Sequence, residues 1–203
     1  EIADRDWSSD VCSSDLMQLV GDNMRVFLSR PRRFGKSLTL STLDAMFRGK
    51  TKLFRGLAVE DWVAEQAKHP CPVLRLDMST MDVRDVPHFE RNLVQTLAWR
   101  AEEEGFQLSS DMPGMALQEL VRALYRTGGP VVVLIDEYDK PILDKIGDLE
   151  AAEAMRMALR SFYTVIKGCD EYLRFVMLTG ISKFTKVAPT RSEERRVGKE
   201  CRS

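Results

Sequence analysis

Five consecutive apolar β-formers, Val131–Ile135, constrain the fold more than any other stretch of the sequence. A strand that is apolar at every position has to be buried on both faces, and such strands are typical of parallel sheets. Parallel neighbours need a long crossover connection, which is usually a helix. The run therefore predicts an α/β protein with a mainly parallel sheet.

The rest of the chain alternates between strand-like and helix-like segments. Further strands are predicted at residues 24–29, 73–78 and 174–179, where β-prone residues lie beside turn residues. Apolar residues at helical spacing predict a helix that is opened by Ser37 and further helices at about 86–104, 115–125 and 150–167. No repeat or linker divides residues 17–190, so we expect one domain, built as a three-layer α/β sandwich.

Composition narrows the classes of function. The 203 residues carry a net charge of −1, with 44% hydrophobic and 30% charged side chains, as in ordinary soluble globular proteins. A balanced charge lacks a basic footprint, so direct nucleic-acid binding is not supported. No apolar run approaches the roughly 18 residues of a membrane span, and the four cysteines lack metal-ligand spacing. We expect a cytoplasmic protein without a membrane segment.

Gly35-Lys36-Ser37 lies between the strand at 24–29 and the helix that follows it. In a P-loop, backbone N–H groups at a helix N-terminus hold phosphate oxygens, the lysine reaches the terminal phosphates, and the hydroxyl ligates Mg²⁺. The general motif has a glycine where this chain has Arg30, so the loop must tolerate arginine there or curve differently. The alternative interpretation is that Ser37 is only a helix cap.

The strand at Val131–Ile135 ends in Asp136-Glu137, which is the form of a Walker B strand. Asp136 is predicted to hold Mg²⁺, directly or through water, beside Ser37. Glu137 is predicted to polarise the attacking water as a general base. The alternative is an ordinary strand that runs into an acidic loop. Because both motifs occur on the expected elements, we favour a site for ATP and Mg²⁺.

Thr179 and two arginines complete the set of candidates. Thr179 ends the strand at 174–179, where a polar residue can touch the γ-phosphate or the attacking water; the alternative is a threonine that merely ends a strand. Arg32 and Arg33 suit phosphate, but both can equally be solvated surface charge. The predicted catalytic residues are Glu137, Lys36 and Thr179, the predicted nucleotide contacts are Arg32, Arg33, Phe34, Gly35, Lys36, Ser37 and Leu38, and the predicted metal ligands are Ser37 and Asp136.

Both ends of the chain differ from the rest of it. Residues 1–16 repeat Ser-Ser-Asp without a helical or strand period, and residues 191–203 are charged with one aliphatic side chain, Val197. Such termini can simply be solvated and disordered. We favour a different origin, because DWSSDVCSSDL and RSEERRVGKECRS resemble in-frame translations of sequencing adapters. Residues 17–190 are then the natural part of the chain.

Three motifs carry a resemblance to a known family. They are RPRRFGKSLTLSTL at Arg30–Leu43, LIDEYDKPI at Leu134–Ile142 and LTGISKF at Leu178–Phe184. With them the chain resembles the AAA-ATPase-like family, which is common in bacteria, over nearly all of residues 24–190. The resemblance makes Arg30 a family feature and matches Thr179 to a sensor-like position. It also matches the family's nucleotide-site positions to Lys36, Ser37, Asp136 and Glu137.

The resemblance implies an additional-strand topology of the AAA and RecA type, with sheet order 5-1-4-3-2, in a chain that ends before strand 5. Many members carry a PD-(D/E)XK nuclease-like domain downstream, so such a domain or a protein partner is expected in the intact gene product. We expect ATP binding and Mg²⁺-dependent hydrolysis that drives or gates this partner. The alternatives are a regulatory module that binds nucleotide with little or no hydrolysis, and a phosphotransferase.

Overall fold

The computed structural model describes residues 16–21, 24–31 and 33–181 of the chain, and residues 16–21 are helical. In chain order the further elements are β1 (Arg25–Ser29), α2 (Lys36–Phe47), α3 (Glu60–Gln66), β2 (Val73–Asp77), α4 (Val86–Glu103), α5 (Pro113–Gly128), β3 (Val131–Asp136), α6 (Lys140–Leu143), α7 (Leu149–Gly168) and β4 (Leu173–Gly180). Short 3-10 helices lie between them as η1 (Thr51–Phe54), η2 (Met78–Thr80) and η3 (Asp170–Tyr172).

The described strands form one sheet in the order β1-β4-β3-β2, and each neighbouring pair is parallel. This confirms the 1-4-3-2 part of the expected order. Parallel pairing puts the carboxyl ends of the strands at one edge, where Ser29 lies opposite Gly180 and Asp77 opposite Asp136. Loops that gather at this edge are the usual place for ligands in open α/β sheets. The expected end of the natural sequence before a fifth strand falls outside the described residues.

The strands bury alternate residues on opposite faces of the sheet, as their pleat requires. On β3, Val132 and Leu134 belong to one core, whereas Val131, Val133 and Ile135 belong to the other. All positions of β3 are buried, and β4 alternates between the two cores in the same way. The apolar run therefore marks a strand covered on both faces, as predicted.

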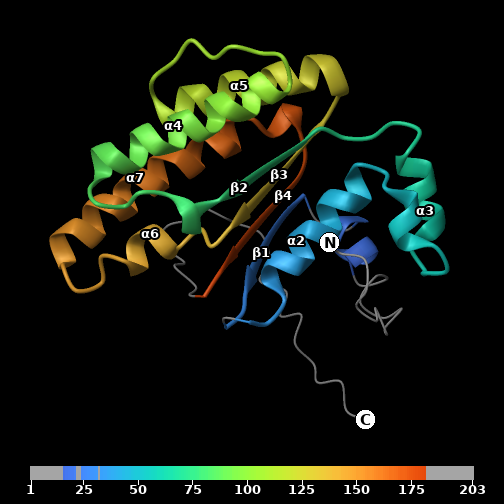
Figure 1. Cartoon of the computed structure of the whole chain (residues 1–203), viewed down its shortest axis with the longest axis horizontal. Helices are drawn as coiled ribbons and strands as arrows, with labels where there is room; N and C mark the ends of the chain where they lie inside the picture. The colour runs from blue at the N-terminus through green and yellow to red at the C-terminus, as the bar shows by residue number, and fades with distance from the viewer. Residues whose placement is uncertain (1–15, 22–23, 32, 182–203) are drawn as a thin grey trace.

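Helices cover the two faces as separate layers (Figure 1). The helices α2 and α3 pack on the face that carries Val132 and Leu134, and α4, α5 and α7 pack on the opposite face. In the first layer the ring of Phe47 lies 5.6 Å from that of Phe175 and 5.7 Å from that of Trp62, measured between centroids. The result is the expected three-layer α/β sandwich, with a core on each side of the sheet.

Local sequence signals set the starts of the long helices. Asp85 caps α4 by accepting a hydrogen bond from the His88 N–H at 2.8 Å, and Asp148 caps α7 by accepting one from the Ala151 N–H at 3.0 Å. Pro113 begins α5, a position that suits its fixed φ. The buried stripe of α5 consists of Ala116, Leu117, Leu120, Val121 and Leu124.

The sequence patterns missed α3 and α6. The helix α3 has 7 residues, of which Val63 alone is buried, and α6 has 4 residues. Neither helix is long enough to repeat an apolar spacing, so periodicity cannot find it.

The segments interpreted as adapter-derived, residues 1–16 and 191–203, lie outside the described residues except for Leu16, which packs partly buried beside the α2 layer. The expected end of the natural sequence at residue 190 lies outside them as well. Within the part of the chain that the structure describes, no helix has both the length and the apolar character needed to cross a bilayer.

Candidate functional site

The segment between β1 and α2 turns sharply at Arg33 and Gly35. Gly35 has φ 71° and ψ 13°, and Arg33 has φ 67°, so both residues adopt the left-handed conformation. Glycine adopts it without steric cost, whereas a residue with a Cβ is strained by roughly 1–2 kcal/mol. Arg30 is not among the described residues with positive φ. The loop therefore turns at Arg33 and Gly35 and not at residue 30. It thus tolerates arginine at the position where the general motif has glycine.

Lys36 begins α2 and is almost completely buried, with 5% of its surface exposed. Its ammonium group donates hydrogen bonds to the carbonyl oxygens of Arg30 at 3.0 Å and Pro31 at 3.1 Å. A buried ammonium group has to find acceptors, and the loop itself supplies them here. The side chain of Lys36 thus reaches back across the loop to residues 30 and 31. An anion in that loop would be a stronger hydrogen-bond acceptor for the ammonium group than these carbonyls.

The N-terminus of α2 has no side-chain cap, because Gly35 occupies the N-cap position. The alternative in which Ser37 caps the helix is therefore wrong: Ser37 lies within the first turn and its side chain is exposed. Uncapped N–H groups and the helix dipole give such a terminus a partial positive charge. Backbone donors, a lysine and a serine hydroxyl are thus gathered at one helix end.

The other predicted loop residues lie on the surface. Phe34 and Leu38 are 61% and 51% exposed, although both are large apolar side chains, and Arg33 is exposed too. Arg32 lies outside the described residues. The exposed apolar side chains flank the buried Lys36, so they are placed where a ligand of this loop could cover them.

Asp136 lies on the face of the sheet that α2 covers. Val132 and Leu134 belong to the α2 core, and the period of two along β3 puts Asp136 on the same side. Asp136 is 3% exposed, and its Oδ1 accepts hydrogen bonds from the Thr179 hydroxyl at 2.5 Å and the Glu137 N–H at 3.0 Å. The described residues donate no hydrogen bond to Oδ2, which leaves that oxygen for a further ligand.

Thr179 holds the turn that follows β3. Its hydroxyl oxygen accepts a hydrogen bond from the Glu137 N–H at 3.3 Å, and its carbonyl accepts one from the Tyr138 N–H at 2.9 Å. These contacts fix Glu137 at φ 48°, a left-handed conformation that is uncommon without glycine. Thr179 is completely buried and its hydroxyl contacts Asp136, whereas contact with a phosphate stays a prediction.

The oxygen atoms at this edge fit a hard divalent cation. A serine hydroxyl and a carboxylate oxygen are ligands that Mg²⁺ accepts, and Mg²⁺ usually takes its remaining ligands from water and substrate phosphates. Among the described residues there is no group of three or more His, Cys, Asp or Glu side chains that could hold a metal. Ser37 and Asp136 would therefore hold the cation only together with a bound phosphate.

Two further carboxylates at this edge were missed by the sequence motifs. Asp77 ends β2 directly opposite Asp136 in the strand register, and its Oδ1 accepts a hydrogen bond from the Ser79 N–H at 2.9 Å. Asp139 is 1% exposed and accepts a hydrogen bond from the Ile181 N–H at 2.9 Å. The acidic residue near the end of the strand predicted at 73–78 was the available signal for Asp77, whereas nothing in the pattern linked Asp139 to residue 181.

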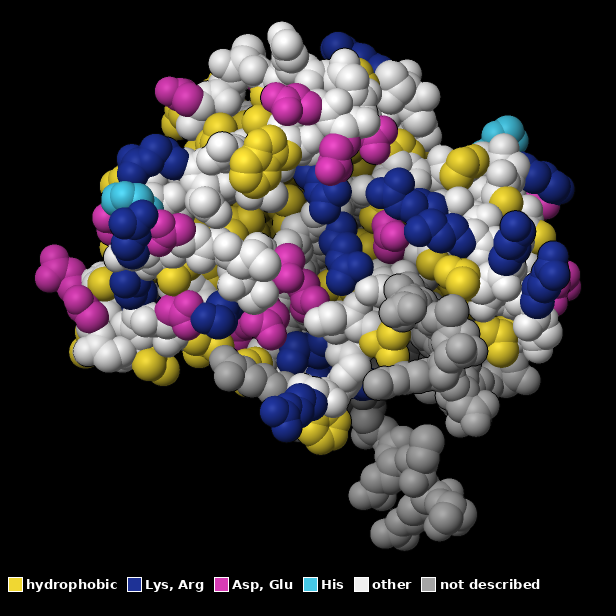
Figure 2. All heavy atoms as spheres, viewed as in Figure 1, with side chains coloured by type: hydrophobic (Ala, Val, Ile, Leu, Met, Phe, Trp, Pro, Cys, Tyr) yellow, Lys and Arg dark blue, Asp and Glu magenta, His cyan; other side chains and the backbone are white. Residues whose placement is uncertain are grey.

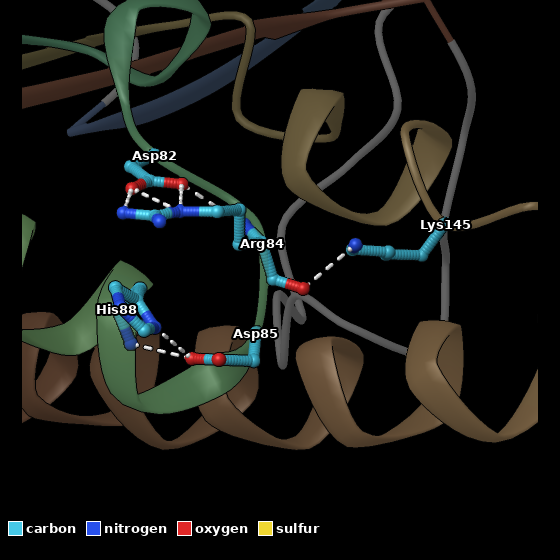
Figure 3. Close-up of polar contacts among 5 residues, drawn as sticks. All are labelled: Asp82, Arg84, Asp85, His88 and Lys145. Carbon is cyan, nitrogen blue, oxygen red and sulfur yellow. Dashed lines mark hydrogen bonds and ion pairs between the residues drawn. The ribbon is translucent and has the colours of Figure 1, made fainter.

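A group of charged side chains fixes the loop between η2 and α4 (Figure 3). The guanidinium of Arg84 lies against Asp82 at 2.6 Å, and the Lys145 ammonium group donates to the Arg84 carbonyl at 2.8 Å. The hydrogen bond from the Arg84 side chain is the main reason that the pKa of Asp82 is lowered to about 2. The contacts join the loop after β2 to the loop after α6, on the carboxyl side of the sheet.

The surface is hollowed between the two helical layers in the view of Figure 2. Lys and Arg side chains gather along this hollow, and Asp and Glu side chains lie beside them. Nucleic-acid-binding surfaces are instead dominated by positive charge. On this face the mixture agrees with the balanced net charge of the chain.

Comparisons with known proteins found one family model, one relative by sequence and one solved structure. A family model described as Predicted AAA-ATPase matches residues 14–189. An uncharacterised protein in the vnfD 5' region of Azotobacter chroococcum mcd 1 is 43% identical over 173 residues, which are 85% of this chain and 33% of that protein. The chain thus spans about one third of the length of this relative. The Aeropyrum pernix ORC1 protein, solved in complex with DNA, aligns with a TM-score of 0.47 and 15% identity over 92% of this chain and 43% of its own.

Proposed function

Since the chain belongs to the family of predicted AAA-ATPases, we propose that it binds ATP with Mg²⁺ in the loop between β1 and α2 and hydrolyses it. The observation that carries the proposal is the pairing of Lys36 with the carbonyl oxygens of its own loop, at the uncapped N-terminus of α2. A buried lysine beside the free N–H groups of a helix N-terminus is the set of donors that a phosphate-binding loop requires.

In the proposed complex the ammonium group of Lys36 exchanges the carbonyls of Arg30 and Pro31 for phosphate oxygens. The exchange is favourable because a charged acceptor makes a stronger hydrogen bond than a carbonyl. The N–H groups in the first turn of α2 donate to the same phosphates. Arg32 and Arg33 add positive charge, and the exposed Phe34 and Leu38 cover apolar parts of the nucleotide.

Ser37 and Asp136 would hold Mg²⁺, which when bound neutralises phosphate charge. Thr179 keeps Oδ1 of Asp136 engaged, so that Oδ2 would be the oxygen that holds the cation. Glu137 acts as the general base that takes the proton of the attacking water. Its fixed backbone, held by Asp136 and Thr179, limits the positions that its carboxylate can reach.

The proposed activity serves a larger protein. We propose that hydrolysis drives or gates a partner or a downstream domain, nuclease-like in the resemblance, and that it does so in the cytoplasm. The fraction of the curated relative that this chain spans, one third, leaves room for such a domain there. A regulatory module that binds nucleotide without turnover is the competing possibility.

Glu137→Gln separates hydrolysis from binding alone. The variant should bind MgATP with an unchanged Kd and lose about 10²–10⁴-fold in turnover, because the amide cannot accept a proton. Phosphate release and equilibrium binding measure the two quantities. Glu171→Gln, which alters a glutamate in η3, is the matched control and should keep both. Wild-type chain that binds MgATP but releases no phosphate would favour the regulatory module.

A further inference from the structure

The peptide that joins Gly180 to Ile181, directly after Thr179, is held from both sides. From β1, the Arg30 N–H donates to the Gly180 carbonyl at 3.2 Å and the Ser29 hydroxyl donates to the Ile181 carbonyl at 3.0 Å. From the turn after β3, the carboxylate of Asp139 accepts the Ile181 N–H at 2.9 Å. We call these four residues, Ser29, Arg30, Asp139 and Ile181, together with Gly180, the exit junction.

Asp139 contributes a carboxylate with 1% of its surface exposed. A buried carboxylate is tolerated only where hydrogen bonds compensate for its lost hydration. A Cβ atom at Gly180 would lie 2.8 Å from Oδ1 of Asp139 and 2.5 Å from Cε1 of Tyr138. The turn after β3 can therefore approach the end of β4 this closely only because residue 180 is glycine.

The exit junction is connected to the predicted phosphate-binding loop through one residue. Arg30 donates its N–H to Gly180 and accepts the ammonium group of Lys36 on its carbonyl at 3.0 Å. Any ligand that draws Lys36 away from this carbonyl changes the contacts of the residue that holds the end of β4. The chain beyond Ile181 starts from this point.

We propose that Asp139 is a positioning residue that clamps the exit junction. When Lys36 leaves the Arg30 carbonyl for a ligand, the clamped junction transmits this change to the backbone at Ile181. The clamp, which is the contact of Asp139 with the Ile181 N–H, does not depend on a ligand. The transmission, which is the effect of ligand binding on Ile181, rests on the function proposed above. Asp139 acts through the Ile181 N–H and not on the nucleotide. It thereby links the loop that is proposed to bind the ligand to the end of β4.

Amide hydrogen exchange in the whole chain, measured by NMR without nucleotide, tests the clamp. Asp139→Leu removes the acceptor and should speed exchange at Ile181 and Arg30 by about tenfold or more, because a charge-assisted hydrogen bond is lost. Asp139→Asn retains an acceptor oxygen and should restore most of the protection. Ser29→Ala, a small change that folding tolerates well, should speed exchange at Ile181 through the other side of the junction.

Asp148→Leu is the matched control, because Asp148 also accepts a backbone N–H, at the start of α7. It should speed exchange at Ala151 and leave Ile181 unchanged. Unchanged exchange at Ile181 in folded Asp139→Leu would overturn the clamp. If Asp139→Leu does not fold, Asp139→Asn decides the question: its neutral oxygen is a weaker acceptor, so Ile181 should still exchange faster than in the wild type, and an unchanged rate would overturn the clamp.

Addition of MgATP tests the transmission. Exchange at Ile181 should change in the wild type and not in Asp139→Leu, and both chains should still bind MgATP, because Asp139 does not contact the nucleotide in the proposal. A wild type that binds MgATP without any change at Ile181 would overturn the transmission. A wild type that does not bind MgATP would overturn the proposed function and the transmission with it, and the experiment without nucleotide would still decide the clamp.

Discussion

One hydroxyl group, that of Thr179, determines how the acidic residues after β3 are held. It donates to Oδ1 of Asp136 and accepts from the Glu137 N–H. Thr179 and Asp136 are shielded from water, because they are 0% and 3% exposed. At the scale of a residue, the candidate site therefore depends on a neutral side chain that the motifs identified only by its place at the end of a strand.

Thr179→Val should lower the free energy of unfolding by about 1–3 kcal/mol, because the buried carboxylate of Asp136 loses a hydrogen-bond donor. Thr179→Ser should keep most of the stability. Urea denaturation measures both. Thr42→Val is the matched control: Thr42 is 5% exposed, but its hydroxyl donates to the Leu38 carbonyl within α2, which has a helical partner already. Equal losses in the two valine variants would contradict the role given to Thr179.

Tyr163 provides a prediction for alkaline pH. Its hydroxyl is buried without a hydrogen-bond partner among the described residues. Burial, with smaller effects of Tyr138 and Asp139, raises the pKa of Tyr163 well above its ordinary value. Above a pH of about 10 the unfolded chain therefore loses this proton while the folded chain retains it, so stability falls as the pH rises further.

Tyr163→Phe should reduce this alkaline loss and leave the neutral-pH stability equal or higher by about 1 kcal/mol, because an unpaired hydroxyl is removed from the core. Urea denaturation at pH 7 and pH 11 measures the effect. Tyr125→Phe, at a position that is 38% exposed, should keep the alkaline loss. A marked destabilisation of Tyr163→Phe at pH 7 would show that the hydroxyl has a partner.

At the scale of the elements, length separates what the sequence predicted from what it could not. The strands and the long helices α4, α5 and α7 were found because each repeats its own spacing of apolar residues. The helix α6 is one turn long, and it starts within the turn that Thr179 holds. Such a helix is fixed by contacts between residues distant in sequence, and no local pattern contains them.

The close contact between the end of β4 and the turn after β3 gives a prediction for these two elements. Gly180→Ala should destabilise the fold by about 1–3 kcal/mol, because the new Cβ would overlap Tyr138, which is 1% exposed and cannot move into solvent. Thermal unfolding measures the change. Gly168→Ala at the end of α7, where a Cβ meets nothing within 4 Å, should be neutral or slightly stabilising. Equal melting temperatures would contradict the close approach.

At the scale of the whole molecule, the strand order brings together residues that lie far apart in sequence. Gly35, Lys36, Ser37 and Asp136 could be proposed from short motifs, because each motif is local. The opposition of Asp77 to Asp136 and the bond from Ile181 to Asp139 could not be predicted without the register of the sheet. Two helical layers cover the faces of the sheet, and these groups lie at its carboxyl edge (Figure 1).

Equilibrium binding of labelled ATP with Mg²⁺ to the wild type and to Lys36→Ala tests the nucleotide site most directly. We predict that the wild type binds and that Lys36→Ala binds at least about tenfold more weakly, since one charge-assisted hydrogen bond contributes about 1.5–3 kcal/mol. Lys50→Ala, which changes a lysine whose side chain is 54% exposed, should bind like the wild type, and circular dichroism should show that all three chains are folded. Equal binding by the folded wild type and folded Lys36→Ala, or no binding by the wild type, would contradict the assignment.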